Sequence, residues 1–152
     1  MIKKALTCKS NDTVSHVIKL MSKKNDKNVK GIIAVLSNDN EFIGCFADGD
    51  LRRIINNNAD LNLPISHFMI KDPIYVFEEE LKTDIALNKI SKLEIHLGRK
   101  VKNIFVINKN KELIGLIDKV QVKEDIIENE INDSCIMGLG FVGLTVACHI
   151  SA

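Results

Sequence analysis

The chain has 152 residues and a net charge of +1, with 45% hydrophobic residues, 5% aromatic residues and no Trp. This length fits one domain, or two small halves that share an aliphatic core. The balanced charge argues against a protein that coats nucleic acid or an anionic membrane. The sequence has neither a signal peptide nor a run of about 20 apolar residues. We therefore expect a cytoplasmic protein with no membrane or nucleic-acid partner.

The first part of the chain predicts a β-α-β-β-α unit. Its elements are a strand over 4–8, a helix capped by Asn11 or Asp12, strands over 31–36 and 42–47, and a helix over 51–57 that Asp48 or Asp50 starts. The first helix carries Val14, Val17, Ile18 and Met21 on one face. The strand over 31–36 is apolar almost throughout, which is typical of a strand buried on both faces.

The second part predicts the same unit again. Its elements are a helical turn over 65–69, a strand over 74–76, a helix over 81–97, strands over 101–107 and 113–118, and a helix over 120–129. The candidate core residues of the long helix are Ile85, Leu87, Ile90 and Leu93. Gly98 is expected to end this helix.

A short sequence repeat connects the two units. Glu41-Phe42-Ile43-Gly44 returns as Glu112-Leu113-Ile114-Gly115, and an apolar run precedes each copy. Internal duplication indicates the architecture, and we expect a mixed α/β (α+β) fold of two β-α-β-β-α repeats about a pseudo-two-fold axis. A short C-terminal strand-turn-helix is expected to follow the repeats. A unit of about 60 residues buries too little surface alone, so the copies should cover each other's sheets. A cleft for a small molecule is expected between them.

The cysteines and histidines form no metal-binding or disulfide pattern, because no CxxC or HExxH spacing occurs. Cys45 and Cys135 lie in apolar strands, and we expect both to pack as small core residues. Only three residues are Arg, and two of them, Arg52 and Arg53, are adjacent. Arg forms bidentate contacts with phosphate and carboxylate, so this pair is either a ligand contact or part of a solvated helix face.

The run Gly44-Cys45-Phe46-Ala47-Asp48-Gly49-Asp50 resembles the ligand signature of CBS domains, and the two repeats together resemble a CBS pair, or Bateman module. The resemblance spans about residues 1–126 and implies an adenosine-type ligand. It places Asp50 on the ribose hydroxyls and puts Ala47 where the family has a phosphate-binding hydroxyl. Arg52 and Arg53 would compensate through charge-assisted hydrogen bonds. The family layout puts Thr7, Lys30 and Ile32 nearby.

An alternative role for Asp50 and the differences in the second copy both limit what this resemblance implies. Asp50 could instead be a carboxylate that stabilises a helix N-terminus, although Asp48 could serve that purpose. In the second copy, Asp118 replaces the hydroxyl residue and would repel a phosphate, and Gln121 replaces the Asp. We therefore predict that the first-copy site is the more competent one.

The C-terminal segment carries a different motif. Residues 135–147 contain Gly138, Gly140 and Gly143 in the GxGxxG spacing of a dinucleotide-binding turn. This segment resembles the N-terminal sequence of nucleotide-sugar dehydrogenases of the UDP-glucose or UDP-N-acetylmannosamine type. The resemblance implies an enzyme of surface-polysaccharide biosynthesis that uses NAD. Since the sequence stops at Ala152, the acidic ribose contact about 20 residues further on is absent. These glycines are thus expected to bind no NAD here. The alternative is a coincidental Gly-rich apolar tail.

The predicted organisation is CBS repeat 1 over 1–62, CBS repeat 2 over 63–128 and the start of a Rossmann domain over 129–152. The first hypothesis is a regulatory module that binds AMP, ATP or a nucleotide sugar ahead of a dehydrogenase and forms a homodimer. The second is a ligand-independent assembly module of that enzyme. Catalysis by this chain is not expected, because the sequence shows no nucleophile–base pair, metal spacing or complete cofactor site.

Overall fold

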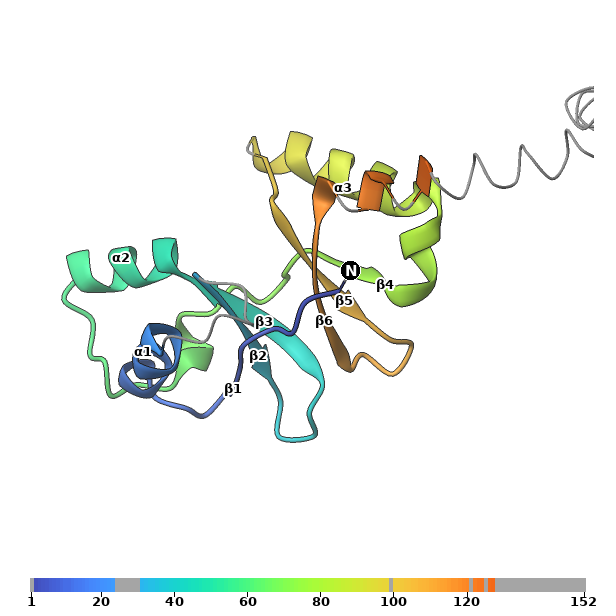
Figure 1. Ribbon diagram of the computed structural model, residues 1–152. Coiled ribbons are helices and arrows are strands. Elements are labelled where there is room, and N and C mark those ends of the chain that lie inside the picture. Colours follow the sequence, from blue (N-terminus) through green and yellow to red (C-terminus); the bar gives the residue numbers. More distant parts are fainter. Residues whose placement is uncertain (1, 24–30, 99, 121, 125, 128–152) are drawn as a thin grey trace, which may run out of the picture.

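The computed structural model describes residues 2–23, 31–98, 100–120, 122–124 and 126–127. Figure 1 shows two similar α/β halves side by side. The first half contains the elements β1 (Thr7–Lys9), α1 (Val14–Ser22), β2 (Ile32–Leu36), β3 (Phe42–Ala47) and α2 (Asp48–Asn56). The 3-10 helix η1 (Ile65–His67) follows. These are the elements of one β-α-β-β-α unit.

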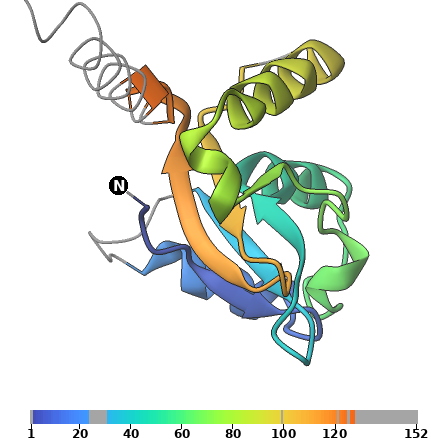
Figure 2. The ribbon, with the colours of Figure 1, turned by 90° about the vertical axis from the view of Figure 1, so that its right-hand side faces the viewer.

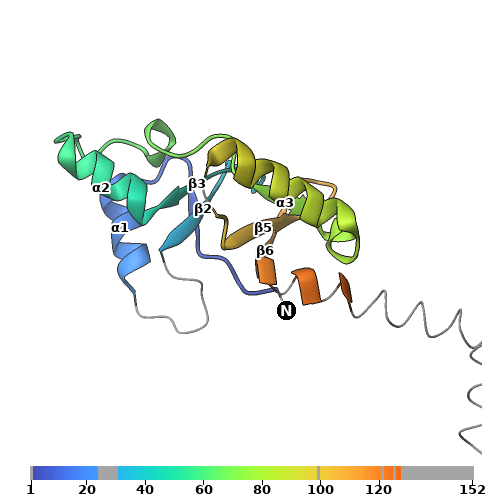
Figure 3. The ribbon, with the colours of Figure 1, turned by 90° about the horizontal axis from the view of Figure 1, so that it is seen from above.

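The second half repeats this order. It contains β4 (Tyr75–Phe77), the 3-10 helix η2 (Glu78–Lys82), α3 (Asp84–Leu97), β5 (Asn103–Ile107) and β6 (Leu113–Asp118). A terminal helical segment follows, of which residues 119–120, 122–124 and 126–127 are described. Figure 3 shows α1 and α2 beside the first sheet and α3 beside the second. The predicted fold class and its two repeats are confirmed, whereas the C-terminal strand-turn-helix over 129–152 lies outside the described residues.

Each half contains a three-stranded sheet with the same topology. In the order β1-β2-β3 the first pair is parallel and the second antiparallel, and β4-β5-β6 has the same arrangement. Both antiparallel pairs shift register at equivalent points, between Val35 and Leu36 and between Val106 and Ile107. The duplication therefore extends to the irregularities of the strands.

The two repeats exchange backbone hydrogen bonds. The segment before β4 pairs with β3, since Ile70 and Cys45 bond in both directions at 2.8 and 3.1 Å. Conversely, Lys3, before β1, pairs with Leu116 of β6 at 2.7 and 2.8 Å. We call these contacts the reciprocal pairings; the crossing of the N-terminal segment to β6 is visible in Figure 2. They tie each repeat to the other's sheet.

The reciprocal pairings explain the repeated glycine of the sequence motif. A Cβ atom at Gly44 would lie 2.8 Å from the carbonyl oxygen of Ile70, and one at Gly115 would lie 2.5 Å from that of Lys3. Both distances are shorter than real Cβ contacts. The start of the motif lies at the same junction, where Glu41 and Glu112 form an antiparallel bridge.

Among the described residues, three apolar clusters form the core. One lies within each repeat, between the sheet and its helices. The third joins the two sheets and contains the buried residues Ala5, Ala34, Phe42, Cys45, Phe105, Ile107 and Leu116. Ile33 and Ala34 of β2 belong to different clusters, so this strand is buried on both faces as predicted. The expected mutual burial of the copies is also confirmed.

Three local predictions were wrong or only partly right. Thr13 caps α1, its hydroxyl accepting the His16 N–H at 3.2 Å, whereas Asp12 accepts the Lys9 N–H at 2.7 Å. Residues 78–82 form a 3-10 helix, and α3 begins only at Asp84 after an extended Thr83. Ile85 is 58% exposed, because Ala86 and Ile90 form the buried face. Gly98 ends α3 with a φ of 61°, as expected.

Candidate functional site

The site is built around the start of α2. The strand β3 ends at Ala47, which is the N-cap residue of the helix. An alanine side chain has no acceptor for the unpaired N–H groups of the first turn. The Asp50 carboxylate instead reaches back and accepts the Ala47 N–H at 2.9 Å. A negative charge at this position also complements the positive end of the helix dipole.

Asp50 is the only charged residue that is buried among those the structure describes, with 5% of its surface exposed. Its Oδ1 atom pairs with the Arg53 guanidinium one turn along α2, and its Oδ2 atom accepts the Ala47 N–H. The Arg53 side chain is 73% exposed. Both carboxylate oxygens thus have partners, and one partner is a cation that solvent reaches. Asp50 thus stabilises the N-terminus of α2, which is the alternative role that the sequence allowed for this residue.

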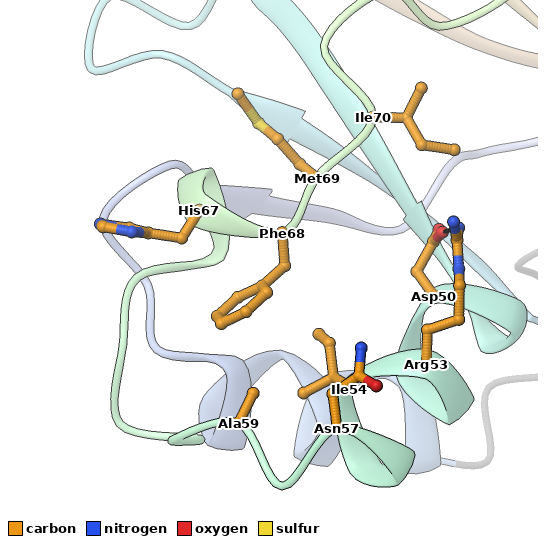
Figure 4. A pocket seen from close by; sticks show the side chains of 9 residues that line it. All are labelled: Asp50, Arg53, Ile54, Asn57, Ala59, His67, Phe68, Met69 and Ile70. Carbon is orange, nitrogen blue, oxygen red and sulfur yellow. Dashed lines mark hydrogen bonds and ion pairs between the residues drawn. The ribbon is translucent and has the colours of Figure 1, made fainter.

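A groove of about 400 Å³ runs between α2 and the segment that leads to β4 (Figure 4). It is lined by Asp50, Arg53, Ile54, Asn57, Ala59, His67, Phe68, Met69 and Ile70. Residues 67–70 belong to the predicted second domain and the others to the first. The groove therefore lies between residues of the two predicted repeats. It does not lie between the two sheets themselves, because the third apolar cluster fills the space between them.

The structure brings together part of the predicted site. Asp50 and Arg53 line the groove, whereas Ala47 donates its N–H to Asp50 and does not line the groove itself. Ile32 pairs with Ala47 in the β2–β3 register, which puts it next to the helix start. Thr7 lies on the edge strand β1, where it pairs with Ala34 of β2. Neither Thr7 nor the exposed Arg52 lines the groove. Lys30 lies outside the described residues.

Seven lining residues were missed from sequence: Ile54, Asn57, Ala59, His67, Phe68, Met69 and Ile70. Asn57 follows Asp50 and Arg53 at helical spacing, a signal that was available. Residues 67–70 carried a weaker one, because Met69-Ile70-Lys71 copies Met1-Ile2-Lys3. Only the pairing of Ile70 with Cys45 shows that this segment crosses β3 and faces α2.

The second repeat differs at the equivalent place. Asp118 accepts the Val120 N–H at 2.9 Å and so caps the terminal helical segment itself. The neighbouring Lys119 forms an ion pair with Glu94 of α3. Glu94 also accepts the Val101 N–H at 2.8 Å, and these two hydrogen bonds, with Lys119 first, lower the pKa of Glu94. Gln121 lies outside the described residues.

Other kinds of site find no support in the described part of the chain. No group of three His, Cys, Asp or Glu side chains there could hold a metal ion. Among the same residues, no helix combines the length and the apolar character that crossing a membrane requires. Cys8 and Cys45 are both buried, as expected for Cys45, whereas Cys135 and the three glycines Gly138, Gly140 and Gly143 lie outside the described residues.

Known structures share this fold across most of the chain. Staphylococcus aureus OpuCA is 20% identical over 84% of this chain and 96% of its own, with a TM-score of 0.60. The CBS domain protein PAE2072 from Pyrobaculum aerophilum, complexed with AMP, is 19% identical over 84% and 92%, with a TM-score of 0.61. The CBS domain pair of MJ0100, in complex with 5′-methylthioadenosine and S-adenosyl-L-methionine, is 14% identical over 80% and 91%, with a TM-score of 0.60.

These likenesses define the class of fold, that of a CBS domain pair. At the level of sequence, residues 1–57 match the family model of the CBS domain. The family match and the structural likeness together support the expectation of a CBS pair. No curated protein matches the chain, and neither comparison bears on a dehydrogenase.

Proposed function

We propose that this chain is a regulatory, non-catalytic module that binds an adenine nucleotide or a nucleotide sugar in the groove between α2 and residues 67–70. The observation that carries this proposal is Asp50. It occupies the position that the CBS resemblance assigns to the ribose, it is buried, and it lies at one end of the groove. The AMP complex of PAE2072 and the nucleoside complex of MJ0100 support the choice of ligand class.

The chemistry of the groove suits such a ligand. A carboxylate accepts hydrogen bonds from the two adjacent hydroxyls of a ribose. Arg53 is exposed and already lies beside Asp50, so its guanidinium would turn to a phosphate without crossing the groove. This would replace the hydroxyl contact that Ala47 does not supply. The apolar wall of Ile54 and Phe68 provides surface for a base.

We propose further that the first-repeat site is the competent one. In the second repeat, the carboxylate of Asp118 is engaged by the Val120 N–H, and Lys119 is held by Glu94. A ligand there would have to break this ion pair or face an uncompensated carboxylate. In the first repeat Asp50 is also engaged, by the Ala47 N–H and by Arg53, but Arg53 is largely exposed and lines the groove, so it is free to turn toward a phosphate.

A thermal-shift and calorimetric panel of AMP, ATP and UDP-glucose tests this function. A ligand at 100 times its Kd should stabilise the fold by about 2.7 kcal/mol. Asp50→Asn should abolish that shift, whereas Asp48→Asn should keep it, because Asp48 is an exposed carboxylate on the same helix that does not line the groove. No shift with any of these compounds at millimolar concentration would reject the proposal.

The link to a nucleotide-sugar dehydrogenase stays a proposal that rests on the motif over 135–147 alone. In this view, the module would adjust an NAD-dependent enzyme of surface-polysaccharide synthesis. The test is to join the chain to a dehydrogenase domain of that class and assay it with and without AMP. A rate that AMP changes in the fusion, and no longer changes in its Asp50→Asn variant, would support the link.

One observation favours the second function, assembly of a homodimer. Several large apolar side chains are exposed on helices, among them Ile85 and Ile95 of α3 at 58% and 83%. Exposed apolar surface of this kind is typical of contacts between proteins. Sedimentation of the chain with and without AMP separates the two functions. Dimers that form without ligand, and that Ile95→Lys disrupts, would support assembly.

A further inference from the structure

The helix α2 presents a row of polar side chains to the groove. Asp50, Arg53 and Asn57 follow one another at helical spacing, so they lie along one face of the helix. All three line the groove, and the buried Ile54 lies between them as its floor. Asn57 is exposed at the far end, at the C-cap of the helix. From Asp50 to Asn57 the helix rises about 10 Å.

The opposite wall supplies an aromatic ring. Phe68 is partly buried and packs against the apolar cluster of the first repeat. Figure 4 shows its ring pointing from the 67–70 segment toward Ile54 and Ala59, and Asn57 lies on the other side of Ile54. A partly exposed ring held by a core on one side offers a fixed apolar surface, on which a nucleobase can stack.

These features divide the groove into two ends. Asp50 and Arg53 form a charged end, and Phe68 and Asn57 form an end with an aromatic surface and a neutral amide. Along the helix axis these ends are separated by about 10 Å. A ribose and phosphate at the charged end would therefore place the base between Phe68 and Asn57.

We propose that Asn57 determines base specificity, by reading the edge of a base that stacks on Phe68. This inference rests on the proposed nucleotide-binding function. An amide presents donors and an acceptor together, and this pairing matches the C6 amino group and the N7 acceptor of adenine. In hypoxanthine the C6 oxygen and N7 are both acceptors, so the amide oxygen has no donor on that edge. The groove thus selects adenine over hypoxanthine through a side chain at the end of α2.

Calorimetric titration of the full chain with AMP and IMP tests this inference. Wild type should bind AMP more tightly than IMP by about tenfold or more, and Asn57→Ala should bring the two affinities together. Asn56→Ala is the matched control, because Asn56 is also exposed, is the next residue of the helix and does not line the groove. Phe68→Leu should weaken both nucleotides to a similar extent, by about tenfold, since stacking does not depend on the exocyclic group.

The outcomes separate the two proposals. If AMP binds and depends on Asp50, but Asn57→Ala keeps the wild-type preference for AMP, the inference is overturned while the proposed function stands. If neither AMP nor IMP binds to the wild-type chain, the adenine-nucleotide function fails and the inference fails with it. Circular dichroism checks that Phe68→Leu is folded. The ratio of AMP to IMP affinity in Asn57→Ala and Asn56→Ala decides the inference without the Phe68 variant.

Discussion

The two repeats begin their second helix in different ways. In the first repeat, Asp50 reaches back from inside the helix to the Ala47 N–H and also pairs with the exposed Arg53. In the second, Asp118 caps the helical segment directly, and Lys119 pairs with Glu94 of α3. Both solutions satisfy an N-terminal N–H group. In the first, the buried carboxylate and its exposed cation both line a groove, and this difference is the reason why we propose the first-repeat site as the competent one.

The largest expected effect concerns two equivalent positions of the first strands, Cys8 in β1 and Val76 in β4, which are both buried. Burial, with a smaller contribution from Asp12, raises the pKa of the Cys8 thiol from 9.0 to about 12. The thiolate fraction at neutral pH should then be roughly 1,000-fold lower than in an unfolded chain. Iodoacetamide labelling followed by peptide mass spectrometry should find Cys8 unmodified in the native protein and modified in urea.

The equivalence of Cys8 and Val76 also predicts the result of a substitution. Cys8→Val should fold and lose little stability, because the position is apolar and the second repeat accepts valine there. Labelling of native Cys8 at the rate of the unfolded chain would contradict the shielded position.

The next effect tests the reciprocal pairings. Gly44→Ala and Gly115→Ala should each destabilise the fold by about 2–4 kcal/mol, because the added Cβ meets the backbone of Ile70 or of Lys3. Urea denaturation measures both. Gly49→Ala is the matched control, since a Cβ there meets nothing within 4 Å and the residue lies in α2. It should stabilise the protein by up to about 1 kcal/mol.

A third comparison concerns the two helix-start carboxylates. Asp50→Ala should lower the free energy of unfolding by about 1–2 kcal/mol and Asp118→Ala by about 1 kcal/mol, because each removes the acceptor of an N-terminal N–H group. Only Asp50→Ala should also remove nucleotide binding. If Asp118→Ala abolished binding while Asp50→Ala did not, the assignment of the competent repeat would be reversed.

The ion pair of the second repeat predicts a pH dependence. The pKa of Glu94 is lowered in the folded state by its hydrogen bonds to Lys119 and Val101. The folded state therefore gains stability from the ionised form, and this gain is lost as the pH falls below about 4.5. The stability difference between wild type and Glu94→Gln should shrink in that range. Glu79→Gln, which removes an exposed pair with Lys109, should show a smaller difference throughout.

The smallest effect concerns the hairpin turns. Asn40 and Lys111 both have left-handed backbone angles, with φ of 65° and 61°. Asn tolerates this region better than Lys, so Lys111→Asn should raise stability by a few tenths of a kcal/mol up to about 1. Asn40→Lys should cost more, because it also removes the Lys9 bond to the Asn40 side chain. Equal and opposite effects would contradict that added loss.

Much of the fold could be predicted because its signals are local. The strands over 42–47 and 113–118 have the predicted bounds, since each is an apolar run between a turn and a charged helix start. The start of α3 could not be placed, because Leu81 continues the apolar pattern although it belongs to a separate 3-10 helix. As a result, Ile85 was wrongly predicted to lie on the buried face of the helix.

The site was less predictable for a physical reason. Asp50 and Arg53 lie in one motif, and the family resemblance found them. Phe68 and Asn57 line the same groove only because Ile70 pairs with Cys45 and so carries its segment across to α2. Nothing in the local sequence specifies a hydrogen bond between residues so far apart in the chain.

The reciprocal pairings also constrain how the molecule can fold. A repeat on its own would leave the backbone groups of Cys45 or Leu116 open, as an unpaired strand edge. Such an edge can recruit the same segment from another molecule, which is the route to a domain-swapped dimer. During synthesis the first repeat leaves the ribosome with this edge exposed until residue 70 follows. We therefore expect the duplicated unit to unfold in a single cooperative transition rather than as two modules in sequence.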